Sequence, residues 1–399
     1  MMLPLAGHAP VLAAVGHPSF LDELGDHLEV LWGALVALVI VVLLTPAVGG
    51  MARLLGVVDQ PGGRRLHTRP IPRLGGLALF LGVIVPALAF LKLAGETRGI
   101  LLGVAVATTV GAVDDFRGLR WWEKLGGQVA AAAIPVWSGI WIDHFTFPFV
   151  GVHGLSEWVG RPLTLLWIVA IMNMVNFLDG LDGLAAGVCA ISGGTFSVIA
   201  LSLEKPNAAV VSAVVLGACL GFLRHNFYPA RIFMGDSGAM LLGFVLATVA
   251  VQGLLKTAAT VALFFPLVVL AVPILDTGFV IAKRLKYGHA PWRADAQHLH
   301  HRFLNIGFSQ RRATVTIWLW CATLSAAALG TRFIPVREHG RWHTWPTVTE
   351  SLLVALAVAA SVYVVYLLEI VKLANPRIRR REAEERRQRA TGQARRRTA

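Results

Sequence analysis

Residues 183–203, GLAAGVCAISGGTFSVIALSL, carry no charged side chain, and neither do residues 206–223, PNAAVVSAVVLGACLGFL, which follow after two charged residues. Each stretch approaches the roughly 20 residues that a helix needs to cross about 30 Å of hydrocarbon. Similar runs lie on both sides of this pair. The sequence therefore predicts eleven spans, at residues 30–52, 74–91, 99–113, 125–142, 162–178, 183–203, 206–223, 237–255, 257–275, 313–331 and 351–368.

The composition indicates the same fold class. Of 399 residues, 56% are hydrophobic and 15% charged, and the mean hydropathy is +0.65, whereas soluble domains average about 25% charged residues. We therefore expect an all-α polytopic membrane protein with about 11 transmembrane helices. This composition excludes a disordered chain, a coiled coil and a secreted domain built on disulfides. The three cysteines lie in apolar runs, where a thiol acts as a small buried hydrophobe.

The distribution of positive charge predicts the orientation. Of the 36 Lys and Arg residues, 27 lie in alternate loops and in the C-terminal tail, and only eight lie on the opposite side. Positive residues gather in cytoplasmic loops, so the N-terminus should lie outside and the C-terminus inside. The same bias explains the net charge of +13 without nucleic acid. We expect a non-cytoplasmic leader over 1–29, a membrane domain over 30–373 and a disordered basic cytoplasmic tail over 374–399.

Five aspartates fall at the predicted cytoplasmic mouth. Asp114 and Asp115 follow the third span in VDDFRGL, Asp179 and Asp182 lie in NFLDGLDGLAAG, and Asp236 lies in FMGDSG. A single aspartate beside glycine is commonly a turn or a helix cap. Five such residues on one face of a charge-poor protein point instead to a functional site.

Clustered carboxylates without cysteine suit Mg²⁺, or else Mn²⁺, and Mg²⁺ takes only one or two protein carboxylates when substrate phosphates complete its shell. Positive partners for anions are also present in the same loops. They are Arg64, Arg65, His67, Arg69 and Arg73 in DQPGGRRLHTRPIPR, Lys124, and the HLHHRF segment with His298, His300, His301 and Arg302. Glycines after the acids predict helix N-termini whose free N–H groups favour phosphate. These features together predict a site for a metal diphosphate.

Five ordered segments resemble a known family. They are RRLHTRPIPRLGG, VGAVDDFRGL, NMVNFLDGLDGLAAG, FMGDSGAMLLG and HLHHRF, and they span roughly residues 30 to 310. This order and spacing is similar to the polyprenyl-phosphate N-acetylhexosamine-1-phosphate transferases, a superfamily of glycosyltransferase family 4 type. The PRLGG ending favours the undecaprenyl-phosphate GlcNAc-1-phosphate branch over the phospho-MurNAc-pentapeptide translocases, which typically read TPTMGG there.

The resemblance implies a phosphoryl transfer. A phosphate oxygen of undecaprenyl phosphate or another polyprenyl phosphate would attack the β-phosphorus of a UDP-sugar, most simply UDP-GlcNAc. The products would be polyprenyl-diphosphate-sugar and UMP, and this would be the initiating step of envelope polysaccharide synthesis. It implies an enzyme of the bacterial inner membrane whose site faces the cytoplasm. The donor hexosamine, the polyprenyl length and a possible homodimer are left open.

The family motifs also imply roles for single residues. Asp236 and Asn176 match metal-site residues, and Asp114 and Asp115 match a pair thought either to deprotonate the lipid phosphate or to support the metal. A phosphomonoester has a second pKa of about 6 and is mostly a dianion at pH 7, which favours the metal and charge-balance role. Asp179 completes the predicted catalytic set. Lys124 resembles a lysine near the phosphates, or else is an interfacial snorkelling residue.

The substrate-binding residues that the resemblance implies lie in the later loops. Asn226 and Phe233 match an asparagine and a phenylalanine that hold uracil, although Phe233 alone could be a lipid anchor. Asp182 is placed with them, and His298, His300, His301 and Arg302 would close over the diphosphate or sugar, with Arg64, Arg65 and His67 opposite. Asp276 is left either as a support for this site or as a partner for Lys283 and Arg284.

Two other classes are less consistent with the pattern. A secondary transporter would place its acids near the middle of spans, whereas only Asp276 is even partly inside one. A non-catalytic scaffold would leave the five motifs without explanation.

The orientation can be tested by labelling single cysteines. A cysteine near Gly62 or Ser237 should react with an impermeant maleimide only from the cytoplasmic side, and one near Glu157 only from outside, because of the charge asymmetry. Labelling of intact cells and inverted vesicles measures this. Reversed labelling would place the acidic mouth on the side without nucleotide sugars and contradict the predicted mechanism.

Overall fold

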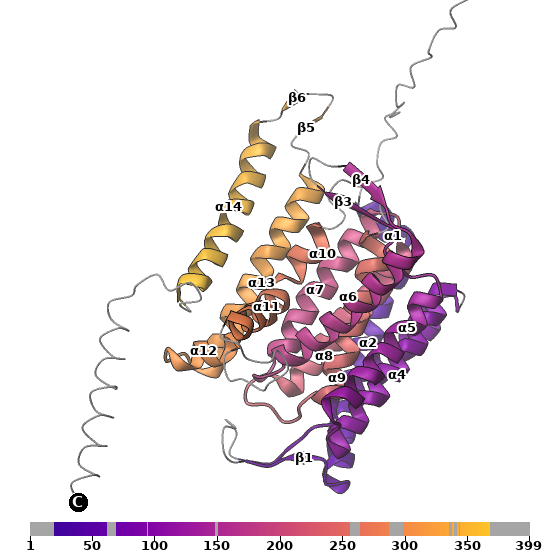
Figure 1. Cartoon of the computed structure of the whole chain (residues 1–399), viewed down its shortest axis with the longest axis vertical. Helices are drawn as coiled ribbons and strands as arrows, with labels where there is room; N and C mark the ends of the chain where they lie inside the picture. Colours follow the sequence, from indigo (N-terminus) through magenta and orange to yellow (C-terminus); the bar gives the residue numbers. More distant parts are fainter. Residues whose placement is uncertain are drawn as a thin grey trace, which may run out of the picture.

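The computed structural model describes residues 20–61, 69–93, 95–147, 151–255, 264–286, 298–334, 337–338, 341–342 and 344–367. Within these residues it is a bundle of helices, shown in Figure 1. The helices are α1 (Phe20–Asp26), α2 (Glu29–Leu54), α3 (Gly75–Phe90), α4 (Gly95–Arg117), α5 (Trp121–Trp137), α6 (Glu157–Leu178), α7 (Leu184–Ser202), α8 (Pro206–Asn226), α9 (Gly235–Val249), α10 (Phe264–Val269), α11 (Ala271–Lys286), α12 (Leu299–Asn305), α13 (Gln310–Phe333) and α14 (Thr344–Leu367).

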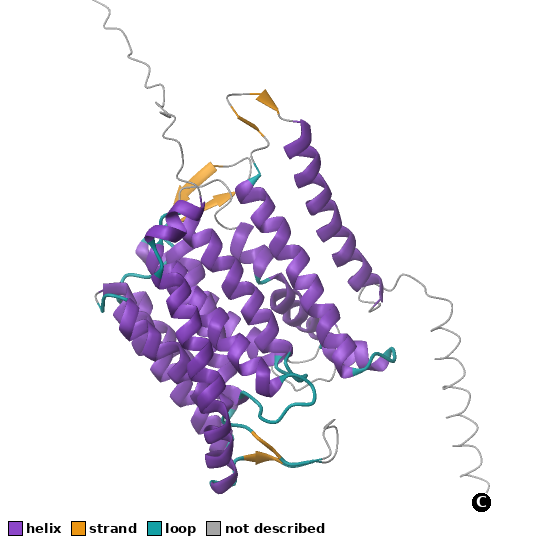
Figure 2. Ribbon diagram, turned by 180° about the vertical axis from the view of Figure 1, so that it is seen from behind, coloured by secondary structure: helices purple, strands orange, loops and turns teal. Residues whose placement is uncertain are grey.

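Three two-stranded antiparallel hairpins join the helices. They are β1 (Val58–Asp59) with β2 (Ile71–Pro72), β3 (His144–Phe147) with β4 (Gly151–Gly154), and β5 (Arg337–Glu338) with β6 (Arg341–Trp342). In Figures 1 and 2 the β1–β2 hairpin lies at one end of the bundle, and the other two hairpins lie at the opposite end. The predicted cytoplasmic and outer loops are thus separated along the bundle axis.

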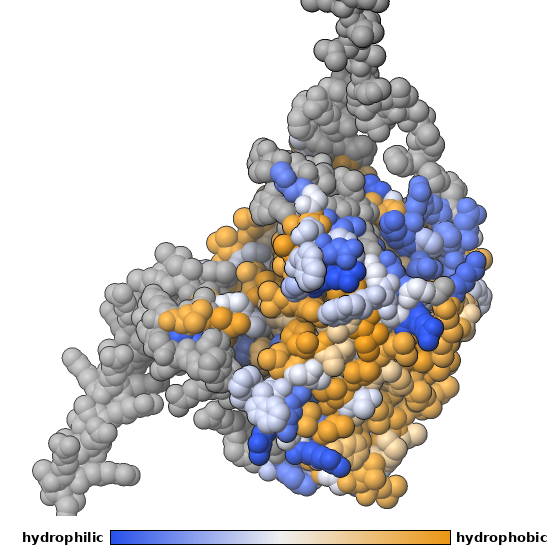
Figure 3. Space-filling model, turned by 45° about the vertical axis from the view of Figure 1, so that its right-hand side comes forward, coloured by the Kyte–Doolittle hydropathy of each residue, from blue (hydrophilic) through white to orange (hydrophobic). Residues whose placement is uncertain are grey.

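The prediction of an all-α membrane protein is confirmed. Eight described helices are long and apolar enough to cross a membrane: α2, α4, α6, α7, α8, α13, α14 and α9 with its continuation to Gly253. In Figure 3 apolar side chains cover the middle of the molecule, and hydrophilic ones gather toward its two ends. Each of the eleven predicted runs overlaps a helix. Four of these helices, α3, α5, α10 and α11, are shorter than the eight that could cross a membrane. The count of eleven and the orientation therefore stay predictions.

The run over residues 257–275 departs from the single span that we expected. Its described part is divided between α10, which ends at Val269, and α11, which begins at Ala271 and continues to Lys286. Before them, α9 passes into a π-helix over Ala250–Leu255. Asp276 therefore lies in the first half of α11, on a helix that extends beyond the predicted span.

The centre of the bundle consists of α7, α8 and α9. In the most apolar stretch of these helices 83%, 72% and 89% of the residues are buried, whereas in that of α14 only 11% are buried. Small residues allow α8 to lie close against α2. Gly217 and Gly221 follow the GxxxG spacing, and a Cβ at Gly221 would lie 2.6 Å from the Leu38 carbonyl oxygen. At Gly217 a Cβ would overlap the Ala34 carbonyl. Small residues at such spacing let membrane helices approach until their backbones are in contact.

Ser237 cannot serve as a position for labelling, since it is completely buried. Tyr228, in the loop that precedes α9, is 45% exposed and is a better position for the cytoplasmic cysteine.

We expect Gly217→Ala to destabilise the protein by about 1–3 kcal/mol, because the added methyl overpacks the contact between α2 and α8. Thermal unfolding in detergent, followed by circular dichroism, measures the change. Gly50→Ala is the matched control, since a Cβ at Gly50 in α2 would have no neighbour within 4 Å, and alanine is the better helix former. Equal melting temperatures for Gly217→Ala and the unmodified protein would show that this contact does not limit stability.

Candidate functional site

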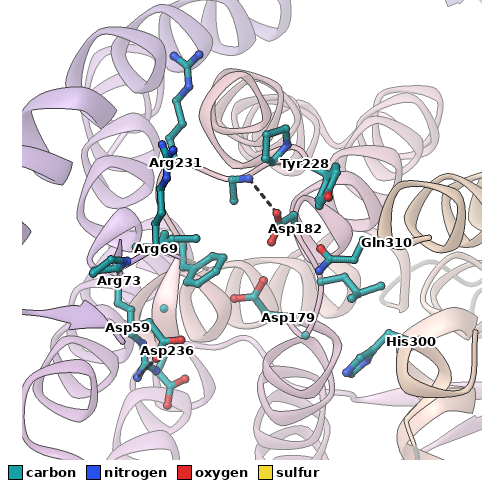
Figure 4. Close-up of a pocket in the computed structure, with 18 of the residues that line it drawn as sticks. Asp59, Arg69, Arg73, Asp179, Asp182, Tyr228, Arg231, Asp236, His300 and Gln310 are labelled. Carbon is teal, nitrogen blue, oxygen red and sulfur yellow. Dashed lines mark hydrogen bonds and ion pairs between the residues drawn. The ribbon is translucent and has the colours of Figure 1, made fainter. Parts of the chain in front are cut away.

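A pocket of about 1090 Å³ opens at the end of the bundle that carries the β1–β2 hairpin. Its volume lies at the upper end of the range usual for ligand sites. Figure 4 shows Arg69, Arg73 and Arg231 along one side and Tyr228, Gln310 and His300 opposite, with Asp179 near the centre and Asp182 beside Tyr228 and Gln310. The lining residues are Arg53, Asp59, Arg69, Pro70, Ile71, Arg73, Asn176, Asp179, Gly180, Leu181, Asp182, Tyr228, Pro229, Ala230, Arg231, Phe233, Gly235, Asp236, His300, His301 and Gln310.

Asp236 lies at the centre of the predicted metal site, in the first turn of α9. Its Oδ1 accepts a hydrogen bond of 2.9 Å from the Asn176 amide on α6. Its Oδ2 forms an ion pair with Lys124 of α5, and the Lys124 ammonium lies 2.9 Å from Asp114 Oδ2. Four of the predicted residues are thus brought together from four different helices. Lys124 is 18% exposed and points into the cluster, which is not the arrangement of a snorkelling residue.

Asp114 and Asp115 are adjacent in sequence but have different surroundings. Asp114 accepts a hydrogen bond from the Leu119 N–H at 2.6 Å and faces Lys124. Asp115 is fully buried and accepts from the backbone N–H groups of Asp236 at 2.9 Å and Ser237 at 3.1 Å, and from the Ser237 hydroxyl at 2.8 Å. Asp115 therefore caps the N-terminus of α9 from another helix and holds Asp236 in place.

This cap uses some of the N–H groups that we expected to favour phosphate at helix N-termini, and the binding of phosphate there stays a prediction. The N–H groups of Asp236 and Ser237 are already bonded to Asp115. At the start of α7 the Gly183 N–H donates to Asn226 Oδ1 at 3.0 Å, and at the start of α12 the Leu299 N–H donates to Asp276 Oδ1 at 2.7 Å. Side chains from neighbouring helices satisfy these donors.

Glycine at 235 is required for the approach of α4 to α9. Gly235 has a φ of +68°, and a Cβ there would collide with the Arg73 carbonyl and the Asp115 carboxylate. At Gly111 of α4 a Cβ would lie 2.5 Å from the Ser237 backbone. Both positions have room only for a hydrogen atom, which explains the glycine of the GDSG segment.

Asp179 points into the middle of the pocket (Figure 4). The structure gives its carboxylate no hydrogen-bond partner among the described residues. Burial, together with the negative charges of Asp236 and Asp115, raises its pKa to about 8. The pocket therefore contains a carboxyl group that is largely protonated at neutral pH, although the positive charge of Arg73 partly opposes this shift.

Asp182 and Asn226 hold the loop between α8 and α9. Asp182 Oδ2 accepts from the Ala230 N–H at 2.9 Å, and Asp182 also lines the pocket. Asn226 is 1% exposed and is absent from the pocket lining. Besides accepting from Gly183, it donates to the Ile232 carbonyl at 2.9 Å. This is a positioning role, and the contact between Asn226 and uracil stays a prediction. Phe233 does line the pocket.

The histidine segment is only partly at the pocket. His298 Nδ1 lies 3.0 Å from Asp276 Oδ2, and its ring is parallel to that of His300, with centroids 5.9 Å apart. His300 and His301 line the pocket, and burial lowers the pKa of His300 to about 3, so its ring is neutral. Arg302 lies instead over the Phe279 ring, 4.4 Å from its centroid.

The structure distinguishes between the two roles that we left open for Asp276. It is 1% exposed, and its two oxygens hold His298 and the start of α12. It therefore supports the histidine segment. A side chain at Gly180 would collide with the His300 ring, so α12 is seated directly on the loop that carries Asp179.

Some of the positive residues that we predicted to bind anions can be placed, and others cannot. Arg64, Arg65 and His67 lie outside the described residues. Arg69 and Arg73 of the same loop line the pocket, as do Arg53 and Arg231, which sequence reasoning missed. Arg73 lies 3.6 Å from Asp115 and 3.8 Å from Asp59. The position of Arg231 in RIFMGDSG, five residues before Asp236, could have indicated that it lies near the site.

Sequence reasoning also missed a pair of amide side chains that lies one helical turn from Lys124. Gln128 of α5 and Asn173 of α6 exchange two hydrogen bonds, of 2.8 Å and 3.2 Å. Gln128 lies one turn below Lys124, and Asn173 about one turn below Asn176. The pair therefore fixes α5 against α6 where both reach Asp236.

Comparison with known proteins adds a second line of evidence. Residues 97–254 match glycosyl transferase family 4. The chain is 38% identical over 297 residues to a probable undecaprenyl-phosphate N-acetylglucosaminyl 1-phosphate transferase of Bacillus subtilis, with 74% of this chain and 83% of the relative covered. It is 37% identical over 336 residues to a decaprenyl-phosphate N-acetylglucosaminephosphotransferase of Mycobacterium leprae, covering 77% and 84%. A phospho-N-acetylmuramoyl-pentapeptide-transferase of Desulforudis audaxviator is 35% identical over 298 residues, covering 67% and 86%.

The two adjacent aspartates should respond differently to the same substitution. Asp115→Asn should destabilise the protein by about 1–2 kcal/mol because α9 loses its cap, whereas Asp114→Asn should leave the melting temperature nearly unchanged. Both should lower turnover at every pH, since neither is expected to be an obligatory base. Turnover from pH 6 to 8 at limiting and saturating Mg²⁺, together with melting curves, tests this. Recovery of either variant by alkaline pH alone would identify that residue as a base.

Proposed function

Because this chain belongs to glycosyl transferase family 4, we infer that it transfers N-acetylglucosamine 1-phosphate to a polyprenyl phosphate in the synthesis of the cell envelope. The relatives that carry this activity in their names cover about three quarters of the chain. The observation that carries the inference within the structure is the pocket itself, where Asp179 and Asp236 face Arg69 and Arg73. Such a pocket suits two phosphorylated substrates.

We further propose that the donor is UDP-GlcNAc, that UMP is released, and that the site faces the cytoplasm. A lipid phosphate accounts for the membrane bundle, and a nucleotide sugar accounts for a pocket at one end of it. The alternate loops that belong to this end, together with the C-terminal tail, hold 27 of the 36 Lys and Arg residues, which favours the cytoplasmic side. Undecaprenyl phosphate is the proposed acceptor in the bacterial inner membrane.

Mg²⁺ fits the residues of this pocket. Among the described residues, no three His, Cys, Asp or Glu side chains converge into a complete protein site. Mg²⁺ does not require one, since it is bound by one or two carboxylates together with substrate phosphates. The negative charge of Asp236 helps to raise the pKa of Asp179 across the pocket, and a cation between the two carboxyl groups would reverse this effect. We propose that Asp236, Asp179 and the Asn176 amide oxygen would hold the ion, which would neutralise charge on the diphosphate.

The transfer forms one P–O bond and breaks another. A phosphate oxygen of the lipid bonds to the β-phosphorus of the donor, and the bond from that phosphorus to the oxygen shared with the α-phosphate breaks, so that UMP leaves. Such a reaction depends mainly on positioning and on neutralising charge. Lys124, between Asp114 and Asp236, is placed to turn its ammonium toward a phosphate that enters the cluster.

We favour a charge-balance role for Asp114 and Asp115 over a role as a base. The lipid phosphate is already mostly a dianion at neutral pH. The Asp115 side chain is fully buried, and both of its oxygens accept hydrogen bonds from the start of α9, which supports a positioning role over contact with a substrate. Asp114 is paired with Lys124, and its charge would keep this lysine from holding the product diphosphate too tightly.

The function is tested by incubating membranes that contain the protein with radiolabelled UDP-sugars, polyprenyl phosphate and Mg²⁺. The panel includes UDP-GlcNAc and UDP-MurNAc-pentapeptide, and we expect label from UDP-GlcNAc in the organic phase. Chelation should abolish transfer, and Asp236→Asn should lower it by about two to three orders of magnitude.

Arg117→Gln is the control, because Arg117 is an exposed residue at the end of α4 that does not line the pocket. It should keep its activity. Near-normal turnover of Asp236→Asn at limiting Mg²⁺ would refute the metal assignment, and transfer from no UDP-sugar would refute the function.

A further inference from the structure

Gln128 of α5 and Asn173 of α6 form a pair of amides that the proposed reaction does not use. Gln128 Nε2 donates to Asn173 Oδ1 at 3.2 Å, and Asn173 Nδ2 donates to Gln128 Oε1 at 2.8 Å. Gln128 is 1% exposed, and neither residue lines the pocket. The two amides satisfy each other, so any effect of this pair on the reaction acts through other residues.

The pair lies beside the two side chains that hold Asp236. Lys124 precedes Gln128 by four residues, and Asn176 follows Asn173 by three, so each of these neighbours shares a face of its helix. The Lys124 ammonium lies 3.4 Å from Asn176 Oδ1. Both side chains reach Asp236, Lys124 by an ion pair and Asn176 by a hydrogen bond of 2.9 Å. Polar side chains thus join α5 to α6 at two successive turns.

The remainder of α5 offers contacts with less direction. After Gln128 the helix continues as VAAAAIPVW, which contains no charged or amide side chain. Burial of apolar surface is non-directional, whereas hydrogen bonds between buried amides require a particular geometry and specify a single arrangement. Glutamine and asparagine often join membrane helices in this way. The amide pair therefore specifies where Lys124 lies relative to Asn176.

This position matters because the reaction asks two things of Lys124. Its ammonium lies between Asp114 and Asp236, and the proposed transfer requires it to turn toward a phosphate. The lysine side chain is flexible, so its backbone has to lie where both positions are within reach. A displacement of about 1 Å in such a group can lower turnover about 100-fold.

We propose that Gln128 and Asn173 are positioning residues for the transfer, which hold Lys124 where it reaches both Asp236 and the substrate phosphate. The proposal rests on the proposed function, because it takes a phosphate to be the partner of Lys124. The pair should influence turnover more than the binding of the donor, since neither amide lines the pocket.

The test uses Gln128→Met, Asn173→Leu and the variant with both changes, which replace amides by apolar side chains of similar shape. Each single variant leaves one amide unpaired and should lower the melting temperature by about 2–4 °C, whereas the double variant should recover most of this loss. In all three, kcat for transfer from UDP-GlcNAc should fall about tenfold to a hundredfold, with KM for UDP-GlcNAc nearly unchanged. Melting curves and steady-state kinetics of the full chain in detergent measure both effects.

A second double variant, Gln128→Asn with Asn173→Gln, exchanges the two amides and keeps their combined length. It should regain most of the lost turnover, because the amides can pair again. Gln252→Met is the matched control, since Gln252 bonds Glu96 at 3.0 Å and does not line the pocket. It should keep a normal kcat whatever its melting temperature.

A normal kcat in the apolar double variant would overturn the proposal and leave the pair with a role in stability alone. So would a loss that appears only in KM, or an exchanged variant that melts normally but is no more active than the apolar one. If the unmodified protein transfers nothing from UDP-GlcNAc, the proposed function fails; if it does transfer, only this inference is at stake.

Discussion

The buried carboxylate of Asp115 is the contact on which the arrangement of this site depends. It lies on α4, but its oxygens accept hydrogen bonds from the first turn of α9. An unpaired N–H group or an isolated charge would be costly at this depth, so each stabilises the other. As a result the side chain of Asp236, whose own N–H is one of these donors, points away from the helix toward Asn176 and Lys124. The small residues Gly111 and Gly235 allow the two helices to meet this closely.

Side chains from other helices also bind the starts of α7 and α12. Asn226 of α8 accepts from the Gly183 N–H, and Asp276 of α11 accepts from the Leu299 N–H. In each case a side chain from a different helix satisfies one of the donors that the first turn of a helix leaves free. The positions of the three loops are therefore coupled to the packing of the bundle.

Much of this arrangement could be predicted from the sequence, and the reasons for the failures are physical. Uncharged runs predict membrane helices because hydrocarbon excludes charge, so α7 and α8 were found almost to the residue. Acids in separate loops predict a shared site, and Asp114, Asp236 and Lys124 do meet. The direction of a side chain depends on its neighbours in space, so the sequence could not distinguish Asp114 from Asp115. It also could not show that Asn226 is occupied with backbone groups, or that Gln310 is turned into the pocket.

The arginines along the pocket make its attraction for phosphates depend on the salt concentration. Arg53, Arg69, Arg73 and Arg231 line the pocket together, and guanidinium groups attract phosphate oxygens by their charge. Dissolved ions screen exposed charges over about 8 Å at physiological salt. The attraction of the arginine side for phosphates therefore weakens as the ionic strength rises.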